Sequence, residues 1–239
     1  NKVIYSGQID EPAANPEIIE ITQYFLQNWN LKTVIMQTHG SIRTESFWAS
    51  LGEISQQSGQ VFRLEFSIDG LEDTNHIYRQ GSSWSRIYKN IRAYISAGGY
   101  ASWKFIKFVH NQHQVEEAHT ISKKLGFKQF VTIDSARPSS KDINTPYNFT
   151  SSEKVKCRAL DDKWLYVHYD GVAQPCCYFG YDERSNSPED NLNYTTVDNY
   201  FGNSKFLKDL QSGWDTPDCN PRCLTKCKHN LRDNRKVFE

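Results

Sequence analysis

The chain has 239 residues, of which 38% are hydrophobic and 13% aromatic, so it can build one large α/β domain or one domain with a small appendage. Its 28 basic and 28 acidic side chains cancel, which gives no overall attraction to nucleic acid or to an anionic membrane, and we expect neither as a partner. No apolar run of about 18 residues predicts a membrane span, and we also expect no signal peptide.

Predicted strands and helices alternate over residues 1–133. The predicted strands cover residues 2–7, 32–38, 61–69, 101–109 and 128–133, and the predicted helices cover residues 15–30, 44–59, 83–99 and 114–127. Asn15 and Pro16 have the residue types of an N-cap and a first helical position, and Gly126 is suited to end the last helix. This order predicts parallel strands joined by right-handed crossovers. It fits an open doubly wound sheet or part of a β/α barrel.

In both architectures the chemistry lies at the carboxyl ends of the strands. The segments at these ends are polar and contain many Gly, Asp, Asn, His and Ser residues: "SGQIDEP", "QTHGS", "FSIDGLEDTNHIYR", "FVHNQHQ" and "IDSARPSS". Any loop between a strand and a helix needs turn and cap residues, so this composition alone does not identify a site.

The remaining sequence differs in character. Residues 137–156 are polar and predict a linker. A hairpin follows, with predicted strands at 163–169 and 172–179 around the turn Asp170-Gly171, and then a helix at 197–212. We therefore expect a first domain over residues 1–136, a linker over 137–156 and a second domain over 157–239.

All six cysteines follow residue 156. The hairpin can bring Cys157 and Cys176 together, and the loop that contains Cys219, Cys223 and Cys227 can add two or three further thiols. Four converging thiolates suit zinc or an iron–sulfur cluster, and disulfides are a third reading. Because the thiols are confined to the last third, we favour a metal site in a reducing compartment, and hence a cytoplasmic protein.

Cys177 and the tryptophans have simpler interpretations. Cys177 points to the other side of its predicted strand from Cys176, and we expect its side chain to pack as a small buried hydrophobic group. The tryptophans assigned to core packing are Trp29, Trp48, Trp84 and Trp103. Trp164 and Trp214 flank the cysteine region and could shield a metal cluster from water.

The strand-end segments and the cysteine spacing together resemble radical S-adenosylmethionine (SAM) enzymes that carry a C-terminal SPASM or twitch domain. "SGQIDEP" is similar to the family's GGEP-type motif, "MQTHGS" to its TNG motif, and "FSIDG" to its fourth-strand motif. The pattern C-x13-G-x4-C, from Cys157 through Gly171 to Cys176, fits the start of a SPASM or twitch domain. The resemblance implies an α/β fold, a partial parallel (β/α) barrel followed by a small cysteine-rich α+β domain.

The resemblance also implies which residues hold cofactors. The residues at its SAM-binding positions are Gly7, Asp10, Glu11, Thr38, Ser67, Asp69, Arg79 and Asn111. In this reading Glu11 meets the SAM amino group, Ser67 approaches the carboxylate, and Asn111 lies near the ribose. Asp10 stands where glycine is usual, and His39 replaces the asparagine of the TNG motif. The candidate ligands of one auxiliary 4Fe-4S cluster are Cys157, Cys176, Cys219, Cys223 and Cys227.

One departure from the family is large, because the CxxxCxxC motif that binds the SAM-cleaving cluster is absent. We expect either a missing N-terminal segment or a degenerate member, and we do not expect the chain as given to cleave SAM reductively. An intact parent would generate a 5′-deoxyadenosyl radical and modify a peptide or a small metabolite, with an electron donor such as flavodoxin or ferredoxin. The catalytic residues stay unassigned.

Two other classes remain open. A non-catalytic α/β binding module would carry a structural zinc on the C-terminal cysteines and would have no affinity for SAM. An unrelated hydrolase or transferase is disfavoured, because the sequence lacks a nucleophile elbow, a P-loop and a dinucleotide-binding glycine motif. His110 and His113 flank Asn111 and are interpreted as polar loop residues rather than metal ligands.

Overall fold

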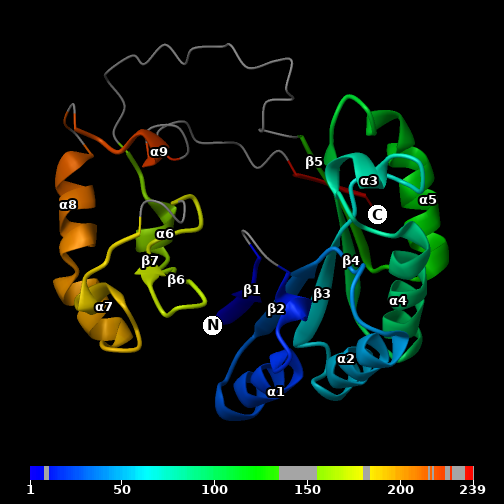
Figure 1. The fold of residues 1–239 in the computed structure, drawn as a ribbon, viewed down its shortest axis with the longest axis horizontal. Helices are drawn as coiled ribbons and strands as arrows, with labels where there is room; N and C mark the ends of the chain where they lie inside the picture. The colour runs from blue at the N-terminus through cyan, green and yellow to red at the C-terminus, as the bar shows by residue number, and fades with distance from the viewer. Residues whose placement is uncertain are drawn as a thin grey trace. The chain divides into compact units, whose positions relative to one another are not determined.

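The computed structural model describes residues 1–7, 11–134, 155–179, 184–214, 216, 218–223, 227 and 235–238. The chain divides into two compact units, which Figure 1 shows as ribbons. The first unit comprises Asn1–Thr145 and Asn234–Glu239, and the second comprises Pro146–Asp233. The last residues therefore belong to the first unit, which the sequence patterns did not indicate.

The first unit is built on a six-stranded, mostly parallel sheet. Its parallel strands pair in chain order: β1 (Lys2–Tyr5), β2 (Thr33–Thr38), β3 (Phe62–Ser67), β4 (Ala101–Lys107) and β5 (Gln129–Asp134). The C-terminal strand β8 (Arg235–Phe238) adds to the edge of β5 in the antiparallel direction. The five predicted strands and their parallel arrangement are thus confirmed, and β8 is an addition that only long-range pairing creates.

The helices of this unit cover one face of the sheet (Figure 1). These are α1 (Ile18–Asn28), α2 (Glu45–Gln57), α4 (Trp84–Ser96) and α5 (Val115–Leu125), with the short α3 (Asn75–Tyr78) and the 3-10 turns η1 (Pro12–Ala14) and η2 (Gln112–Gln114) in the loops. Phe66 shows the packing, because its ring centroid lies 5.8 Å from that of Trp48 on α2 and 6.0 Å from that of Tyr94 on α4. Since side chains alternate along a strand, every second residue points to the opposite, open face.

The ends of the helices follow local sequence, with one exception. Gly126 ends α5 with a φ of 89°, a left-handed conformation that glycine adopts without strain. The expected start of the first helix at Asn15 and Pro16 is wrong, since α1 begins at Ile18 with Glu17 as its N-cap. The Asn15 side chain instead accepts a hydrogen bond from the backbone N–H of Glu17 at 2.8 Å, which is a local turn that competes with helix.

The hydrophobic core of the first unit contains two fully buried tryptophans, Trp48 and Trp103. Trp103 contacts Trp84 with ring centroids 6.5 Å apart, and its indole N–H donates to the Ile68 carbonyl at 2.9 Å. Trp29 does not belong to this core, because 56% of its surface is exposed at the end of α1. Its assignment to core packing was therefore wrong, and it lines a surface pocket instead.

The second unit is small and mixes short helices with one short hairpin. Its elements are α6 (Arg158–Asp161), β6 (Tyr166–Val167), β7 (Ala173–Gln174), η4 (Pro188–Asp190), α7 (Val197–Asn203), α8 (Lys205–Gly213) and α9 (Pro221–Cys223). The hairpin has the predicted Gly171 turn, with a φ of 85°, but its strands are shorter than the pattern indicated. The helix expected at 197–212 is two helices, because the Ser204 hydroxyl accepts from the Leu207 N–H and starts α8.

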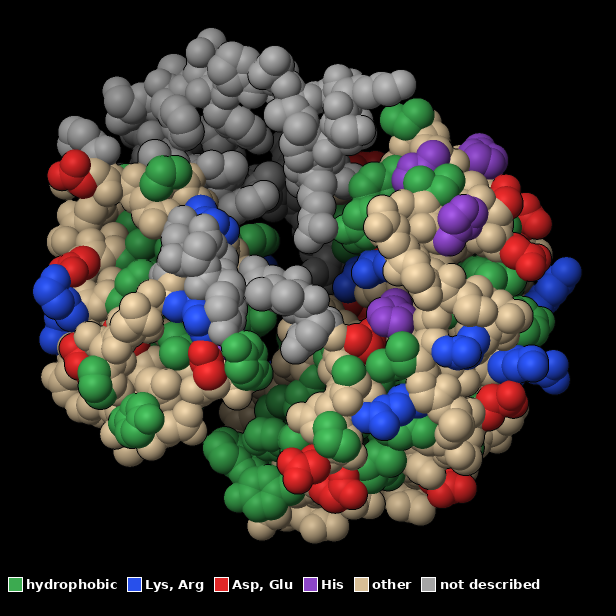
Figure 2. Space-filling view, in the orientation of Figure 1, with side chains coloured by type: hydrophobic (Ala, Val, Ile, Leu, Met, Phe, Trp, Pro, Cys, Tyr) green, Lys and Arg blue, Asp and Glu red, His purple; other side chains and the backbone are tan. Residues whose placement is uncertain are grey.

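The distribution of charged side chains on the surface agrees with the balanced net charge of the chain. On the face of the first unit in Figure 2, Lys and Arg side chains lie among Asp and Glu side chains, and neither sign gathers into a large patch among the coloured residues. No helix within the described residues is long and apolar enough to cross a lipid bilayer.

A buried tryptophan gives a direct test of this core. We expect Trp103→Phe to lower the free energy of unfolding by about 2 kcal/mol, because it leaves the Ile68 carbonyl without its donor and a small cavity beside Trp84. Urea unfolding followed by circular dichroism measures the change. The matched control is Trp29→Phe at an exposed position, which we expect to stay within about 0.5 kcal/mol of the original protein. Equal losses of unfolding free energy in the two variants would contradict the assignment of Trp103 to the core and of Trp29 to the surface.

Candidate functional site

Glu11 joins the loops that follow β1 and β2. Its Oε2 atom accepts the backbone N–H of His39 at 2.9 Å and lies 3.2 Å from Nε2 of the same imidazole. Its Oε1 atom accepts the N–H of Ala13 at 3.3 Å and so caps the 3-10 turn η1. The Ser41 N–H donates to Nδ1 of His39 at 3.0 Å, so the neutral imidazole carries its proton on Nε2, next to Glu11. The GGEP-like and TNG-like segments therefore meet through one carboxylate.

The loop after β2 is held in a fixed shape. The Thr38 hydroxyl is buried and accepts the Gly40 N–H at 2.9 Å, and Asn90 on α4 donates to the Gly40 carbonyl at 2.9 Å. Gly40 has a φ of 71°, and a Cβ atom there would lie 3.0 Å from the Phe66 ring. Glycine is required at this position both for its backbone conformation and for space. Thr38 therefore helps to hold the shape of this loop by bonding to its backbone.

Asp69, just after β3, connects Arg79, just after α3, with Ile106 near the end of β4. Its side chain is fully buried, and its Oδ2 atom receives Nε and Nη2 of Arg79, each at 2.7 Å. Its Oδ1 atom accepts the Ile106 N–H at 2.7 Å. Burial raises the pKa of Asp69 above its ordinary value, while the charge of Arg79 and the bonds to Ile106 and Arg79 oppose that rise. Arg79 thus compensates a carboxylate that would otherwise be costly to bury.

Asn111 is fully buried, and both ends of its amide are used. Its Oδ1 atom accepts the Phe108 N–H at 2.7 Å, and its Nδ2 atom donates to the carbonyls of Asp69 at 2.8 Å and of Ile106 at 2.9 Å. The arrangement makes Asn111 a residue that fixes the loop after β4. Asp69 and Arg79 from the segment after β3 and Asn111 from the segment after β4 form one connected network.

The other predicted positions differ in exposure. Gly7 is exposed just beyond β1, whereas Ser67, which ends β3, is buried, and Asp10 lies outside the described residues. The strand-end residues from β1 to β4 are thus gathered along one edge of the sheet.

A row of polar side chains on the open face was not singled out from the sequence. Ser6 donates to Gln37 at 2.7 Å, Gln37 donates to Glu65 at 2.8 Å, and Lys104 pairs with the same Glu65 carboxylate. This row crosses from the end of β1 to β4 on the face that the helices leave uncovered. The signal was present as polar residues at alternate positions in "RLEFS" and "SWKFI", but alternation does not tell which face is open.

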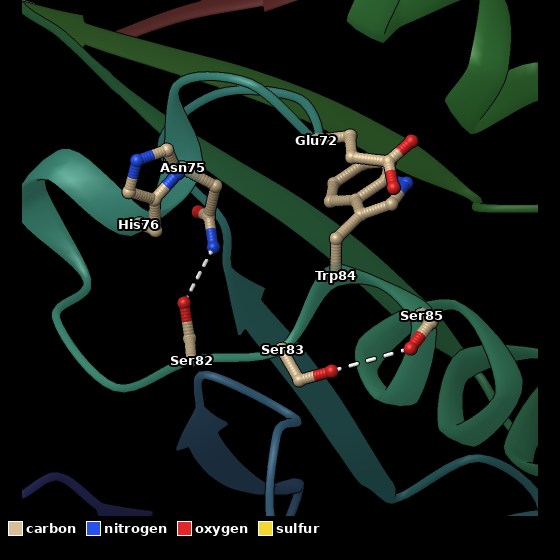
Figure 3. Close-up of a pocket in the computed structure, with 7 residues that line it drawn as sticks. All are labelled: Glu72, Asn75, His76, Ser82, Ser83, Trp84 and Ser85. Carbon is tan, nitrogen blue, oxygen red and sulfur yellow. Dashed lines mark hydrogen bonds between the residues drawn. The ribbon is translucent and has the colours of Figure 1, made fainter.

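A small polar pocket of about 260 Å³ lies in the loop between β3 and α4 (Figure 3). Its lining consists of Glu72, Asn75, His76, Ser82, Ser83, Trp84 and Ser85. Figure 3 shows the Asn75 side chain bonded to Ser82 across the pocket, at 3.0 Å. The Ser83 N–H donates to Ser41 at 2.8 Å, and Ser41 in turn contacts His39, so the rim of the pocket is linked to the Glu11 network.

Five thiols lie in one region of the second unit. Cys219 and Cys223 are buried in a small apolar cluster with Val155, Phe179 and Leu210, and the half-buried Cys176, Cys227, Phe206 and Trp214 pack against it. The pKa of Cys176 is raised to about 11, chiefly by burial and in part by the nearby thiols of Cys177, Cys157 and Cys227. The pKa of Cys223 is raised to about 12, again chiefly by burial, with contributions from Cys227, Cys219 and Cys176.

The mutual effects on their pKa values indicate that Cys157, Cys176, Cys219, Cys223 and Cys227 lie in one region of the second unit. The six thiols form no disulfide. Among the described residues, no group of three or more His, Cys, Asp or Glu side chains is arranged to hold a metal ion. Cys177 is exposed, so the expectation of a buried hydrophobe was wrong; it follows the short strand β7 rather than lying within it.

Solved structures similar to this chain are radical SAM enzymes. SuiB of Streptococcus suis bound to S-adenosylmethionine superposes with a TM-score of 0.62 at 12% identity, over 87% of this chain and 56% of that chain. The enzyme anSMEcpe with bound AdoMet gives a TM-score of 0.59 at 13% identity, over 87% of this chain and 68% of that chain. The same enzyme with AdoMet and a peptide gives 0.59 at 14% identity.

The chain thus spans little more than half the length of SuiB. No protein-family model matches the sequence, and no curated protein matches it either. At these identities the likeness establishes the fold, which is the mostly parallel α/β fold of radical SAM enzymes.

The network around Asn111 makes a testable claim. We expect Asn111→Ala to lower the free energy of unfolding by about 2–4 kcal/mol, because one buried N–H and two buried carbonyls lose their partner. Urea unfolding checks this value. The matched control is the neighbouring exposed residue in Gln112→Ala, for which we expect a change of about 0.5 kcal/mol or less. A stability of Asn111→Ala equal to that of the control would show that the loop does not depend on this side chain.

Proposed function

We propose that the chain is the greater part of a radical SAM enzyme whose intact form cleaves S-adenosylmethionine and modifies a peptide or a small metabolite. The observation that carries the proposal is the likeness to SAM-bound SuiB, which extends over 87% of this chain and therefore includes residues of both units. The strand-end motifs add independent support, because they meet at the edge of the sheet where ligands of such folds bind.

The barrel character of the first unit belongs to this proposal. Strands β1 to β5 pair in strict chain order, and α1, α2, α4 and α5 cover a single face. A doubly wound sheet has helices on both faces and a point where the strand order reverses. The observed order therefore supports a segment of a (β/α) barrel whose inner face carries the row Ser6, Gln37, Glu65 and Lys104.

In the proposed SAM site, two sets of residues have different tasks. Glu11 and Ser67 would contact the cofactor, the partly buried Glu11 through its negative charge and the buried Ser67, at the end of β3, through its hydroxyl. Gly7 and Asp10 belong to the same strand-end segment as Glu11. The residues that would shape the loops around the cofactor are Thr38, Asp69, Arg79 and Asn111. Their hydrogen bonds to backbone groups place the strand ends before any ligand binds.

The second unit has donors suited to an auxiliary 4Fe-4S cluster. Four thiols, those of Cys176, Cys219, Cys223 and Cys227, share one small apolar core, and the indole N–H of Trp214 is buried there without a hydrogen-bond partner. A buried donor beside thiols fits a site that later contains thiolates, since a thiolate accepts hydrogen bonds better than a thiol. We assign Cys157 and Cys176 as ligands, completed from Cys219, Cys223 and Cys227. The domain that holds them would be of the SPASM or twitch type.

When bound, the clusters and SAM would supply electron transfer and the radical that abstracts hydrogen from the substrate. The chain's own residues would position SAM, exclude water and hold the substrate near the open face. An electron donor of the flavodoxin or ferredoxin type would be a partner. A peptide substrate is supported by the peptide-bound form of anSMEcpe, although the residues described here do not choose between a peptide and a small metabolite.

The metal content separates the two readings of the cysteines. We expect anaerobically purified protein to contain about four irons and four acid-labile sulfides per chain, with a brown absorption band at about 400 nm. One zinc without colour would instead indicate the non-catalytic module with a structural zinc. Elemental analysis and an absorption spectrum give the answer.

Single substitutions assign the ligands within that experiment. We expect Cys157→Ala and Cys176→Ala to lose most of the metal, because each removes a thiolate that no neighbouring group replaces. Cys177→Ala is the matched control, since this thiol is exposed and adjacent in sequence to a proposed ligand. Equal metal loss in all three variants would contradict the assignment.

Binding of SAM tests the first unit separately. We expect Glu11→Gln to weaken SAM binding about 10–100-fold, because it removes one charge-assisted hydrogen bond of about 1.5–3 kcal/mol while keeping the size of the side chain. Isothermal titration calorimetry measures the two affinities. Glu53→Gln, at an exposed position on α2, is the control with the same change in charge. Equal affinities of both variants, or no SAM binding by the original chain, would contradict this site.

A further inference from the structure

Arg43, two residues before α2, has a backbone conformation that its residue type rarely adopts. Its φ is 65°, in the left-handed region that favours glycine. The other described non-glycine residues of this kind, Gln60 and Lys163, lie just beyond the ends of α2 and α6, where a left-handed residue commonly ends a helix. Arg43 instead precedes a helix. Such strain persists only where surrounding contacts hold it, so the contacts of Arg43 should explain it.

The Arg43 side chain binds the backbone of the loop after β1. Its Nε atom donates to the Ala13 carbonyl at 2.7 Å, and its Nη2 atom donates to the Ala14 carbonyl at 2.9 Å. Its guanidinium lies 5.4 Å from the ring centroid of Phe47 on α2, which supports the side chain from its own loop. Because the guanidinium is a rigid planar fork, two bonds to successive carbonyls fix the orientation of the η1 turn as well as its position.

Glu11 makes the reciprocal contact between the same two loops. It is the N-cap of η1, and its Oε2 atom accepts the backbone N–H of His39, which lies in the loop that also contains Arg43. Glu11 thus reaches from the first loop to the second, and Arg43 reaches back. Since Ala13 and Ala14 follow Glu11 by two and three residues, a shift of the turn that Arg43 holds would also shift the Glu11 carboxylate.

The Glu11 carboxylate keeps room for one further donor. A carboxylate offers about four acceptor positions. Three are used, by the N–H of His39, the imidazole Nε2 of His39 and the N–H of Ala13. In the parts of the chain that the structure describes, no Lys or Arg side chain forms an ion pair with Glu11. The remaining position therefore suits a cationic donor on a ligand, such as an ammonium group.

We propose that Arg43 is a positioning residue for Glu11, which it holds in place to receive the ammonium group of S-adenosylmethionine. The inference rests on the proposed SAM site and deepens it, because it assigns a task to a residue outside the motifs of the resemblance. A carboxylate that is already fixed loses less conformational freedom when the ligand binds. The strained backbone of Arg43 is offset by the two bonds that only this conformation allows its side chain to make.

The first test measures the affinity of the full chain for SAM by isothermal titration calorimetry. We expect Arg43→Ala to weaken SAM binding about 3–10-fold, because the η1 turn and Glu11 must then be ordered by the ligand. Arg92→Ala, at an exposed position on α4, removes the same charge and is the matched control, which should bind as the original chain does. Equal affinities of Arg43→Ala and the original chain would overturn the inference.

Arg43→Gly separates positioning from the stability of the fold. It removes the same side chain as Arg43→Ala, but glycine adopts a φ of 65° without strain. We expect Arg43→Gly to unfold at a higher urea concentration than Arg43→Ala and yet to bind SAM as weakly. A SAM affinity of Arg43→Gly close to that of the original chain would show that affinity follows stability alone, and would overturn the inference.

A double-mutant cycle tests whether Arg43 acts through Glu11. In a Glu11→Gln background, Arg43→Ala should cause a much smaller further loss of SAM affinity, because the charge that it positions is already absent. The same fold-loss in both backgrounds would mean that Arg43 acts on the ligand by another route, and the inference would fall.

Hydrogen exchange tests the contact between the loops without SAM. The backbone amide of His39 is held by Glu11, so we expect it to exchange faster in Arg43→Ala than in the original chain and in Arg92→Ala. Unchanged exchange would overturn the inference. The two proposals also fail differently: if the original chain binds no SAM, the proposed SAM site falls and the inference with it, whereas equal SAM binding by the original chain and Arg43→Ala refutes only the role of Arg43.

Discussion

Parallel pairing of five strands in chain order is the constraint on which the first unit depends. Each crossover must return the chain to the same end of the sheet, and all four long helices lie on one face. This arrangement leaves the other face open and brings the carboxyl ends of the strands to one edge. The strand-end segments, which are far apart in sequence, meet there for this reason.

Two carboxylates hold that edge together in different ways. Glu11 is partly exposed and bridges two loops through backbone N–H groups and His39. Asp69 is buried, and Arg79 compensates its charge while Ile106 and Asn111 complete the network. The first carboxylate keeps part of its surface exposed, whereas the second is fully buried and fixes the shape of the loops. A resemblance to a family motif cannot distinguish these tasks, because both residues occupy motif positions.

The second unit illustrates how a small core can depend on its thiols. Its apolar clusters contain few large side chains, and cysteines occupy central places in one of them. The thiols raise one another's pKa values and surround an indole N–H that has no acceptor. The raised pKa values keep these thiols protonated at neutral pH, and the indole N–H is left without an acceptor in this core.

The sequence by itself determined the order of strands and helices in the first unit, the polar strand ends and the confinement of the thiols to the last third. These features follow from hydrophobic periodicity and local residue preferences, which act over a few positions. Only the tertiary structure decided that Trp29 and Cys177 are exposed, that β8 joins the edge of β5, and that Gln37, Glu65 and Lys104 form a row. Each of these depends on which face of an element is covered by a distant segment. It also decided that Asn111 binds backbone groups and that Trp214 packs against the thiol-containing apolar cluster, because side-chain direction is set by packing between segments far apart in the chain.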